Sequence, residues 1–243
     1  MTSRLRQTSQ PGEALEAFPE FPPRDDMQNF LHLYRIGHLS MLIRHFGSPE
    51  TTVIASEAPV AWRPSGGPGV RIPDLLIAFN VSFASLVDRN GYAIEVQGKP
   101  PDFVLEVASP HTARNDYTGK RMDYAAFGIR EYWRFDPTGG DRYPAALAGD
   151  RLVDGAYQPM EIVQTGERHF RGHSDALNLD LCWEQGQLRW WDPAQGRYLE
   201  THDEEADARV AAEARAGMAE ARADVAEARV RELEEKLRRR QGD

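Results

Sequence analysis

The sequence predicts an α/β fold in which a mixed sheet is flanked by helices and followed by a long C-terminal helix. Between residues 27 and 140, segments with apolar residues at helical spacing and short apolar runs predict the order helix, three or four strands, helix, strand. This order is typical of a mixed sheet with helices on its faces. Residues 201–243 are rich in alanine, glutamate and arginine and contain no proline, which favours one long solvated helix. A chain of 243 residues can bury one sizeable core and still leave an extra segment.

The N-terminal part of the chain divides into a lead-in and a first core helix. Residues 1–26 contain four of the 16 prolines and few periodic apolar positions, so we expect a flexible lead-in. From Met27, apolar side chains recur at mostly three- and four-residue intervals until Gly47 and Pro49 end the pattern. This spacing predicts an amphipathic helix that begins the folded domain.

Short apolar runs that are rich in β-branched residues and bounded by glycine or proline predict the strands of the sheet. They cover residues 51–62, 73–81, 91–98, 102–110 and 130–140. A second helix is expected over residues 115–128, because Asn115 or Asp116 can cap its start and a glycine closes it. Residues 141–200 hold further apolar stretches separated by glycines, which we interpret as hairpins at one edge of the sheet.

The sequence therefore indicates three segments: a lead-in over residues 1–26, a folded domain over 27–200 and a charged helix over 201–243. The helix carries 12 acidic and nine basic residues and only a thin seam of valine, methionine and leucine, which is a weak coiled-coil pattern. The alanines between these positions bury little area. We therefore expect a homodimer held mainly by the folded domain, with the helix as a secondary contact.

The overall composition excludes several classes of protein. The net charge of −9 counts against a passive DNA-binding module, although a carboxylate-rich site with a divalent metal can still attract phosphate. Cys182 is the single cysteine and is expected to be an inert packed side chain, so an intrachain disulfide and a cysteine-rich zinc module are excluded. No apolar stretch is long enough to span a membrane, and the N-terminus lacks a secretory signal, so we expect a cytoplasmic protein.

Two acidic residues stand at or within otherwise apolar strands, where a carboxylate is costly to bury. Asp74 begins the apolar run 75–79, and Glu106 has only apolar neighbours in the run 103–108. If these strands are neighbours, both carboxylates can converge on one Mg²⁺, which uses one or two carboxylates with water and substrate phosphate. The alternative is that both acids lie on a solvated face of the sheet. Asp102, which also begins its strand, is a weaker candidate.

Lys120 can add a cation to this pair of acids. It lies 14 residues after Glu106, about one turn into the helix expected beyond the strand's C-terminal end, where open α/β sheets place their sites. From there its amine can stabilise negative charge that develops on a phosphoryl group. The alternative is a surface lysine paired with Asp116, four residues earlier.

Several motifs resemble those of a known family. The chain contains PDLLIAF, the long pattern PPDFVLEVASPHTARNDYTGKRMDYAAFGIREYWRFDP, and later LNLDLCW and LRWWDP. These are similar to the Uma-two family of putative restriction endonucleases, in the PD-(D/E)XK nuclease superfamily, from about Met27 to Leu199 and most strongly over residues 71–137. The resemblance implies a restriction-endonuclease-like sheet flanked by helices and Asp74 and Glu106 as metal ligands. It also implies DNA as substrate, with hydrolysis of its phosphodiester bonds in the presence of Mg²⁺ or Mn²⁺.

One position departs from the superfamily pattern, which has a lysine two residues after the second acid. That position is Ala108 here. Lys120 matches the family's own lysine on the following helix, so the resemblance implies that Lys120 completes the catalytic set with Asp74 and Glu106. The missing lysine and the acidic net charge also support a protein of another class, a catalytically silent interaction protein that keeps the nuclease scaffold and acts through its C-terminal helix.

Other groups in the sequence favour structural interpretations. The seven histidines form no HExxH pair, and no glycine stands where a P-loop requires one before Lys120. Ser109 and Thr112, beside a histidine, are nucleophile candidates, but such hydroxyls commonly shape a turn and cap a helix. Four aromatic side chains can stack on bases or pack in the core, and core packing is favoured. They are Tyr132, Trp133, Trp190 and Trp191.

Overall fold

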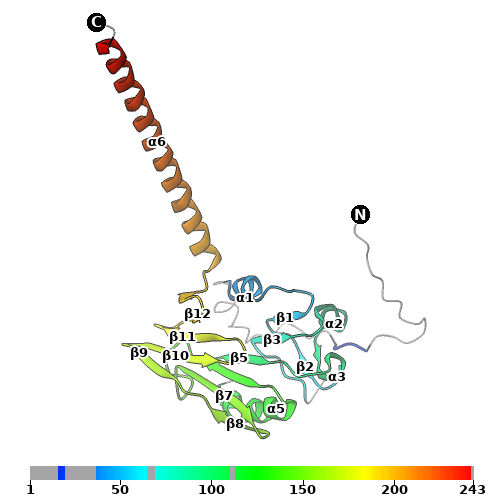
Figure 1. Ribbon diagram of the computed structural model, residues 1–243. Helices are drawn as coiled ribbons and strands as arrows, with labels where there is room; N and C mark the ends of the chain where they lie inside the picture. Colours follow the sequence, from blue (N-terminus) through cyan, green and yellow to red (C-terminus); the bar gives the residue numbers. More distant parts are fainter. Residues whose placement is uncertain (1–15, 20–36, 65–68, 110–112, 242–243) are drawn as a thin grey trace, which may run out of the picture. The chain divides into compact units, whose positions relative to one another are not determined.

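A computed structural model describes residues 16–19, 37–64, 69–109 and 113–241. The chain divides into two compact units, residues 1–199 and 200–243. The first unit contains the sheets and the shorter helices, and the second contains one 40-residue helix, α6 (His202–Gln241) (Figure 1). Within the described residues, no helix is both long enough and apolar enough to cross a membrane.

A six-stranded sheet forms the centre of the first unit. Its strands are β1 (Thr52–Ala55), β3 (Leu75–Phe79), β5 (Phe103–Val107), β6 (Glu131–Phe135), β7 (Leu147–Val153) and β8 (Ala156–Pro159). Their order in space is the order just given; β5 and β6 run parallel, and all other neighbours run antiparallel. The predicted mixed sheet is confirmed.

The helices of the first unit follow the sequence prediction in part. They are α1 (His38–Phe46), α2 (Phe83–Asp88), α3 (Ile94–Gln97), α4 (Ala113–Tyr117) and α5 (Gly119–Phe127). The predicted first helix ends with α1, and its first half, residues 27–36, lies outside the described residues, as does most of the lead-in. The second predicted helix is divided into α4 and α5, because Thr118 leaves the helical conformation (φ −120°, ψ −87°).

The prediction of a strand over residues 91–98 is wrong in its second half. Only β4 (Tyr92–Ala93) is extended, and it pairs in parallel with β2 (Val60–Ala61). The chain then turns into α3, which Gly98 ends in the left-handed conformation that glycine adopts readily (φ 76°). The sequence did not predict α2, which Ser82 caps by accepting a hydrogen bond from the backbone N–H of Ser85.

Residues 141–200 form more than hairpins at the edge of the central sheet. The β7–β8 hairpin does extend that edge, but the following strands build a separate five-stranded antiparallel sheet. These strands are β9 (Val163–Gly166), β10 (His169–Ser174), β11 (Leu179–Glu184), β12 (Gln187–Asp192) and β13 (Arg197–Tyr198). Alternate residues of β11 and β12, such as Leu181 and Trp190, are buried, so this sheet has one apolar face that requires a partner layer.

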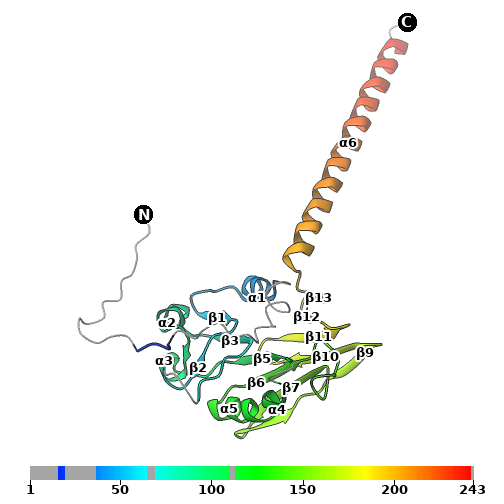
Figure 2. The ribbon, with the colours of Figure 1, turned by 180° about the vertical axis from the view of Figure 1, so that it is seen from behind.

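Side chains alternate between the two faces of the central sheet, and each face has its own core. On one face, Phe103 and Trp133 belong to a cluster that includes α1 and the second sheet. On the opposite face, Val104 and Tyr132 pack with Tyr124 of α5 (Figure 2 shows α4 and α5 beside β6 and β7). Tyr132, Trp133 and Trp190 are fully buried, which supports their predicted core role.

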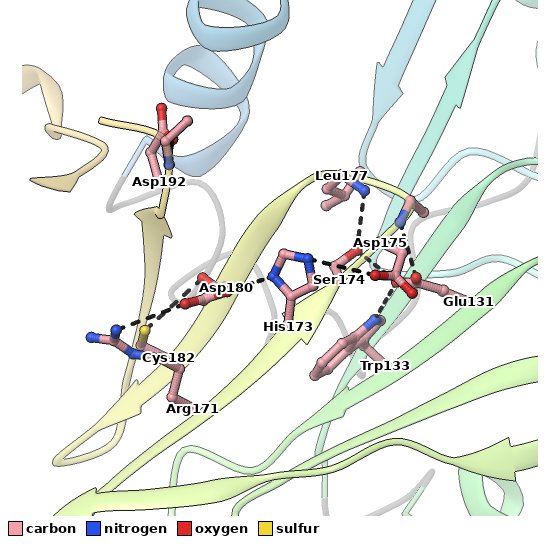
Figure 3. Close-up of polar contacts among 12 residues, drawn as sticks. Glu131, Trp133, Arg171, His173, Ser174, Asp175, Leu177, Asp180, Cys182 and Asp192 are labelled. Atoms are coloured by element: carbon pink, nitrogen blue, oxygen red, sulfur yellow. Dashed lines mark hydrogen bonds and ion pairs between the residues drawn. The ribbon is translucent and has the colours of Figure 1, made fainter. Parts of the chain in front are cut away.

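A buried carboxylate joins the two sheets at the start of β6. Glu131 accepts hydrogen bonds from Trp133 Nε1 (3.0 Å), Ser174 Oγ (2.6 Å) and the backbone N–H of Ala176 (2.9 Å); Figure 3 shows this junction. These partners are all neutral donors, so Glu131 has a structural role. Cys182 is also buried, and burial raises the pKa of its thiol to about 11, as expected of an inert packed side chain.

Candidate active site

Asp74 and Glu106 lie opposite each other on neighbouring strands. β3 and β5 are antiparallel, with Leu75 opposite Leu105 and Leu76 opposite Val104. Continuing this register by one residue places Asp74 opposite Glu106, and directly opposed residues of an antiparallel pair point to the same face. The structure therefore brings the two predicted acids together on one face of the sheet.

Both acids are buried, with 3% of Asp74 and 2% of Glu106 exposed, so the alternative of a solvated strand face is wrong. The backbone N–H of Val107 donates to Asp74 Oδ2 (2.6 Å), and the Tyr124 hydroxyl donates to Glu106 Oε1 (2.6 Å). Such bonds offset part of the cost of burying a carboxylate.

The electrostatics of the pair follow from this burial. Burial raises the pKa of Asp74 well above its ordinary value, and the neighbouring Glu106 raises it further, while the Val107 N–H opposes the change. Burial also raises the pKa of Glu106, although the ammonium of Lys120 acts in the opposite direction. Two carboxyl groups that repel each other in a dry site are poised to accept a cation or to retain a proton.

Lys120 extends from α5 into the same cluster. Its Nζ lies 2.8 Å from Glu106 Oε2 and 2.8 Å from Asp116 Oδ1, and only 8% of the residue is exposed. Burial lowers the pKa of Lys120, but the charges of Glu106 and Asp116 outweigh this effect and raise it above the ordinary value. Lys120 is therefore a buried cation shared by two carboxylates. The pairing with Asp116 in the alternative interpretation is confirmed, but its surface location is wrong.

Asp116 is a site residue that the sequence did not predict. The sequence suggested it only as a helix cap or as the partner of a surface Lys120. It is completely buried. The Tyr143 hydroxyl donates to Asp116 Oδ2 (2.6 Å), and the Tyr132 hydroxyl donates to its backbone carbonyl (2.8 Å). The four-residue spacing to Lys120 was the available signal, but nothing in the sequence indicated that the pair is buried.

Asp102 does not belong to the cluster. Its Oδ2 accepts a hydrogen bond from the backbone N–H of Phe79 (2.9 Å), and the ammonium of Lys99 lies 2.7 Å away. Asp102 precedes β5, whereas Glu106 lies near the C-terminal end of that strand. The interpretation of Asp102 as a weaker candidate ligand is therefore wrong, and its contacts stabilise the start of β5. Ser109 is buried, and His111 and Thr112 lie outside the described residues.

The donor set fits a divalent cation that prefers oxygen. Asp74 and Glu106 offer carboxylate oxygens on one face, and their mutual repulsion would be relieved by a bound cation. Within the described part of the chain, no group of three histidine, cysteine, aspartate or glutamate residues could hold a metal ion. Two carboxylates suit Mg²⁺, which keeps several waters and substrate oxygens, better than a metal that needs a complete protein cage.

Comparison with known proteins places the chain in a family. A solved structure described as a putative nuclease belonging to DUF820, from Anabaena variabilis ATCC 29413, matches with a TM-score of 0.36 and 13% identity, over 60% of this chain and 75% of that one. No protein of curated function matches. The sequence model of the family Uma2, described as putative restriction endonuclease, matches residues 26–214. Because this match covers most of the chain, the protein belongs to the Uma2 family.

Proposed function

We propose that the protein is a metal-dependent endonuclease that hydrolyses phosphodiester bonds of DNA. Membership of a restriction endonuclease family supports a nuclease. The observation that carries the proposal is the buried cluster in which Asp74 lies opposite Glu106 and Lys120 contacts Glu106. In this proposal, Asp74 and Glu106 hold Mg²⁺ or Mn²⁺.

The acids and the lysine would have different tasks in hydrolysis. A bound divalent cation supplies a water of lowered pKa and offsets charge on the phosphoryl oxygens. The raised pKa of Lys120 keeps its ammonium protonated near neutral pH, so Lys120 acts as a cation that stabilises developing negative charge rather than as a general base.

Neighbouring side chains would fix the position of the catalytic groups. Tyr124 holds one oxygen of Glu106, and Lys120 lies against the other. Asp116, itself held by Tyr143, fixes the ammonium from the opposite side. Lys120 extends from α5 rather than from the end of β5, so its orientation depends on these contacts.

The second candidate is a catalytically silent interaction protein. The observation that favours it is α6, whose apolar side chains are exposed within their own unit. These are Val210, Met218, Val225, Val230, Leu233 and Leu237. An exposed apolar seam of this kind is suited to a partner helix.

A cleavage assay separates the two candidates. Supercoiled and linear DNA would be incubated with the full chain in Mg²⁺, Mn²⁺ or chelator, and products would be resolved on a gel. The proposal expects cleavage that requires the metal and is lost in Asp74→Asn and Glu106→Gln. The control is Asp154→Asn, which should retain activity. Asp154 is exposed in the β7–β8 turn, and asparagine tolerates its left-handed backbone conformation (φ 49°). Absence of cleavage by the unaltered chain under all these conditions would favour the interaction protein.

A further inference from the structure

The proposed site is too acidic to attract a phosphodiester by itself. Asp74, Glu106 and Asp116 contribute three carboxyl groups, whereas Lys120 is the one ammonium that contacts the cluster in the described residues. That ammonium already lies 2.8 Å from two carboxylates. Besides the proposed metal, a nuclease of this design needs a cation that holds the DNA backbone, since phosphate contacts supply much of the affinity for DNA.

Several buried or half-buried arginines of the first unit have their charge offset by an acid. Arg121 and Arg134 both contact Asp150, at 3.0 and 2.6 Å, and Arg71 contacts Asp123 at 2.6 Å. These arginines are bound within the protein and are poorly suited to a phosphate.

A cavity of about 500 Å³ beside β7, β8 and β10 shows the same compensation. Arg151 pairs with Asp175, and Arg171 lies 3.7 Å from Asp180. His173, also at this cavity, contacts Asp180 through Nδ1 at 2.7 Å (Figure 3). Because its cations are matched by acids, this cavity does not select an anion.

Arg142 is different. It lies in the loop between β6 and β7 and is partly exposed. Its Nη1 donates to the carbonyl oxygen of Ala108 (3.0 Å), and among the described residues no carboxylate lies within ion-pair distance of its guanidinium. Four of its five N–H donors are therefore not used by that bond.

The position of Arg142 relates it directly to the cluster. Ala108 is the second residue after Glu106, at the C-terminal end of β5, and is the position where the superfamily pattern has its lysine. The next residue along the loop, Tyr143, donates to Asp116. The loop therefore contacts the end of the strand with one residue and the acidic cluster with the next.

Asp136 holds this loop in place. Its carboxylate accepts hydrogen bonds from Thr138 Oγ1 (2.6 Å) and from the backbone N–H groups of Arg142 and Tyr143 (2.9 Å each). Although burial opposes the change, these bonds keep the pKa of Asp136 below its ordinary value. The carboxylate stays ionised near neutral pH, so the backbone that carries Arg142 is fixed in advance of substrate binding.

We infer that Arg142 binds a backbone phosphate of the nucleic acid beside the scissile bond. The contact supplies, at the C-terminal end of β5, a cation for which the described residues provide no carboxylate at ion-pair distance. This inference rests on the proposed function, because it assumes that the substrate is a polynucleotide.

The test is DNA binding as a function of salt. The fluorescence anisotropy of a labelled duplex would be measured in Ca²⁺, and cleavage kinetics in Mg²⁺, for the full chain and for Arg142→Ala, Arg142→Lys and Arg130→Ala. Arg130 is an exposed arginine just before β6, at the opposite end of that strand, and serves as the matched control. We expect Arg142→Ala to weaken binding about tenfold and to reduce the slope of log K against log salt by about 0.9. KM should rise with little change in kcat, Arg142→Lys should recover much of the loss, and Arg130→Ala should behave as the unaltered chain.

The possible failures are distinguishable. If the unaltered chain cleaves DNA but Arg142→Ala keeps its affinity and salt slope, the inference is overturned and the proposed function stands. A lower melting temperature with an unchanged salt slope would show that the bond to Ala108 is merely structural, which also overturns it. If the unaltered chain neither binds nor cleaves DNA, the proposed function fails, and the inference fails with it.

Discussion

Two buried glutamates on neighbouring parallel strands, Glu131 on β6 and Glu106 on β5, show why burial alone does not identify a site. Both are at most 2% exposed, and they point to opposite faces of the sheet. Neutral donors surround Glu131: an indole, a hydroxyl and a backbone N–H. Glu106 instead shares its surroundings with two further carboxyl groups and an ammonium. A buried acid among neutral donors stabilises the fold, whereas a buried acid among other charged groups is a candidate for chemistry.

The largest effect should come from exchanging the acid for an amide at these two positions. Glu106→Gln should reduce cleavage by a factor on the order of 10³, because it removes the negative charge of a proposed metal ligand. Glu131→Gln should instead lower the free energy of unfolding by about 1–3 kcal/mol, since the amide cannot accept all the bonds that the carboxylate accepts. Denaturant titration and cleavage per folded molecule measure the two effects. If Glu131→Gln abolished cleavage without loss of stability, the comparison would be broken.

Lys120 should affect both activity and stability. Lys120→Met removes the cation that separates Glu106 from Asp116, so we expect a rate loss of about 10²–10³ and a stability loss of about 3–5 kcal/mol. The sequence alone gave no indication that this lysine is buried. Lys120→Arg, which keeps the charge, separates the two effects. Unchanged cleavage in folded Lys120→Met would remove this residue from the catalytic set.

Much of the fold follows from local sequence patterns. The strands that carry Asp74 and Glu106 are short apolar runs with clear boundaries, and the acids stand out because their neighbours are apolar. Glu131 shows the limit of this signal. It opens β6, which also contains large apolar residues, and only the distant Ser174 and Ala176 reveal its role. Asp116 was undervalued for the same reason, since its partner Tyr143 lies 27 residues away. The second sheet was also missed, because short apolar strands do not indicate which sheet they join.

A smaller effect is expected where the cluster meets its tyrosine support. Tyr143→Phe removes the donor to Asp116 Oδ2 and should lower kcat about tenfold, because Asp116 then positions Lys120 less well. KM should change little, since Tyr143 is buried and does not reach the substrate. The matched control is Tyr157→Phe, which removes a buried tyrosine bond to the Ile129 carbonyl. Equal losses of kcat in both variants would indicate general destabilisation rather than positioning.

The raised pKa of Asp74 predicts how stability depends on pH in metal-free protein. The folded state holds a proton on Asp74 more tightly than the unfolded state does. This contribution is complete below the ordinary carboxyl pKa of about 3.8 and is lost as the pH rises towards the raised folded value. Melting temperatures measured across acidic to neutral pH should show this decline, and Mg²⁺ should reduce it by competing with the proton. Asp74→Asn should weaken both the decline and the response to Mg²⁺, leaving the part of the decline that the raised pKa of Glu106 contributes. An unchanged decline and an unchanged response would assign them to another group.

Removal of the C-terminal helix should have the smallest effect on cleavage, which depends on Glu106, and on stability, to which Glu131 contributes. Both Glu106 and Glu131 belong to the unit of residues 1–199, which has its own hydrophobic cores. Truncation after Leu199 should therefore leave cleavage and melting temperature nearly unchanged.

The apolar seam of α6 is largely alanine between its valine and leucine positions, and at ~25 cal/mol per Å² such a seam contributes weakly to association. We propose that the homodimer needed to cut both strands is held mainly by the first unit, so sedimentation should find the truncated chain dimeric. A truncated monomer beside a dimeric full chain would assign assembly to the helix. Single-strand nicking by that monomer would show that the cluster of Asp74, Glu106 and Lys120 acts without a partner.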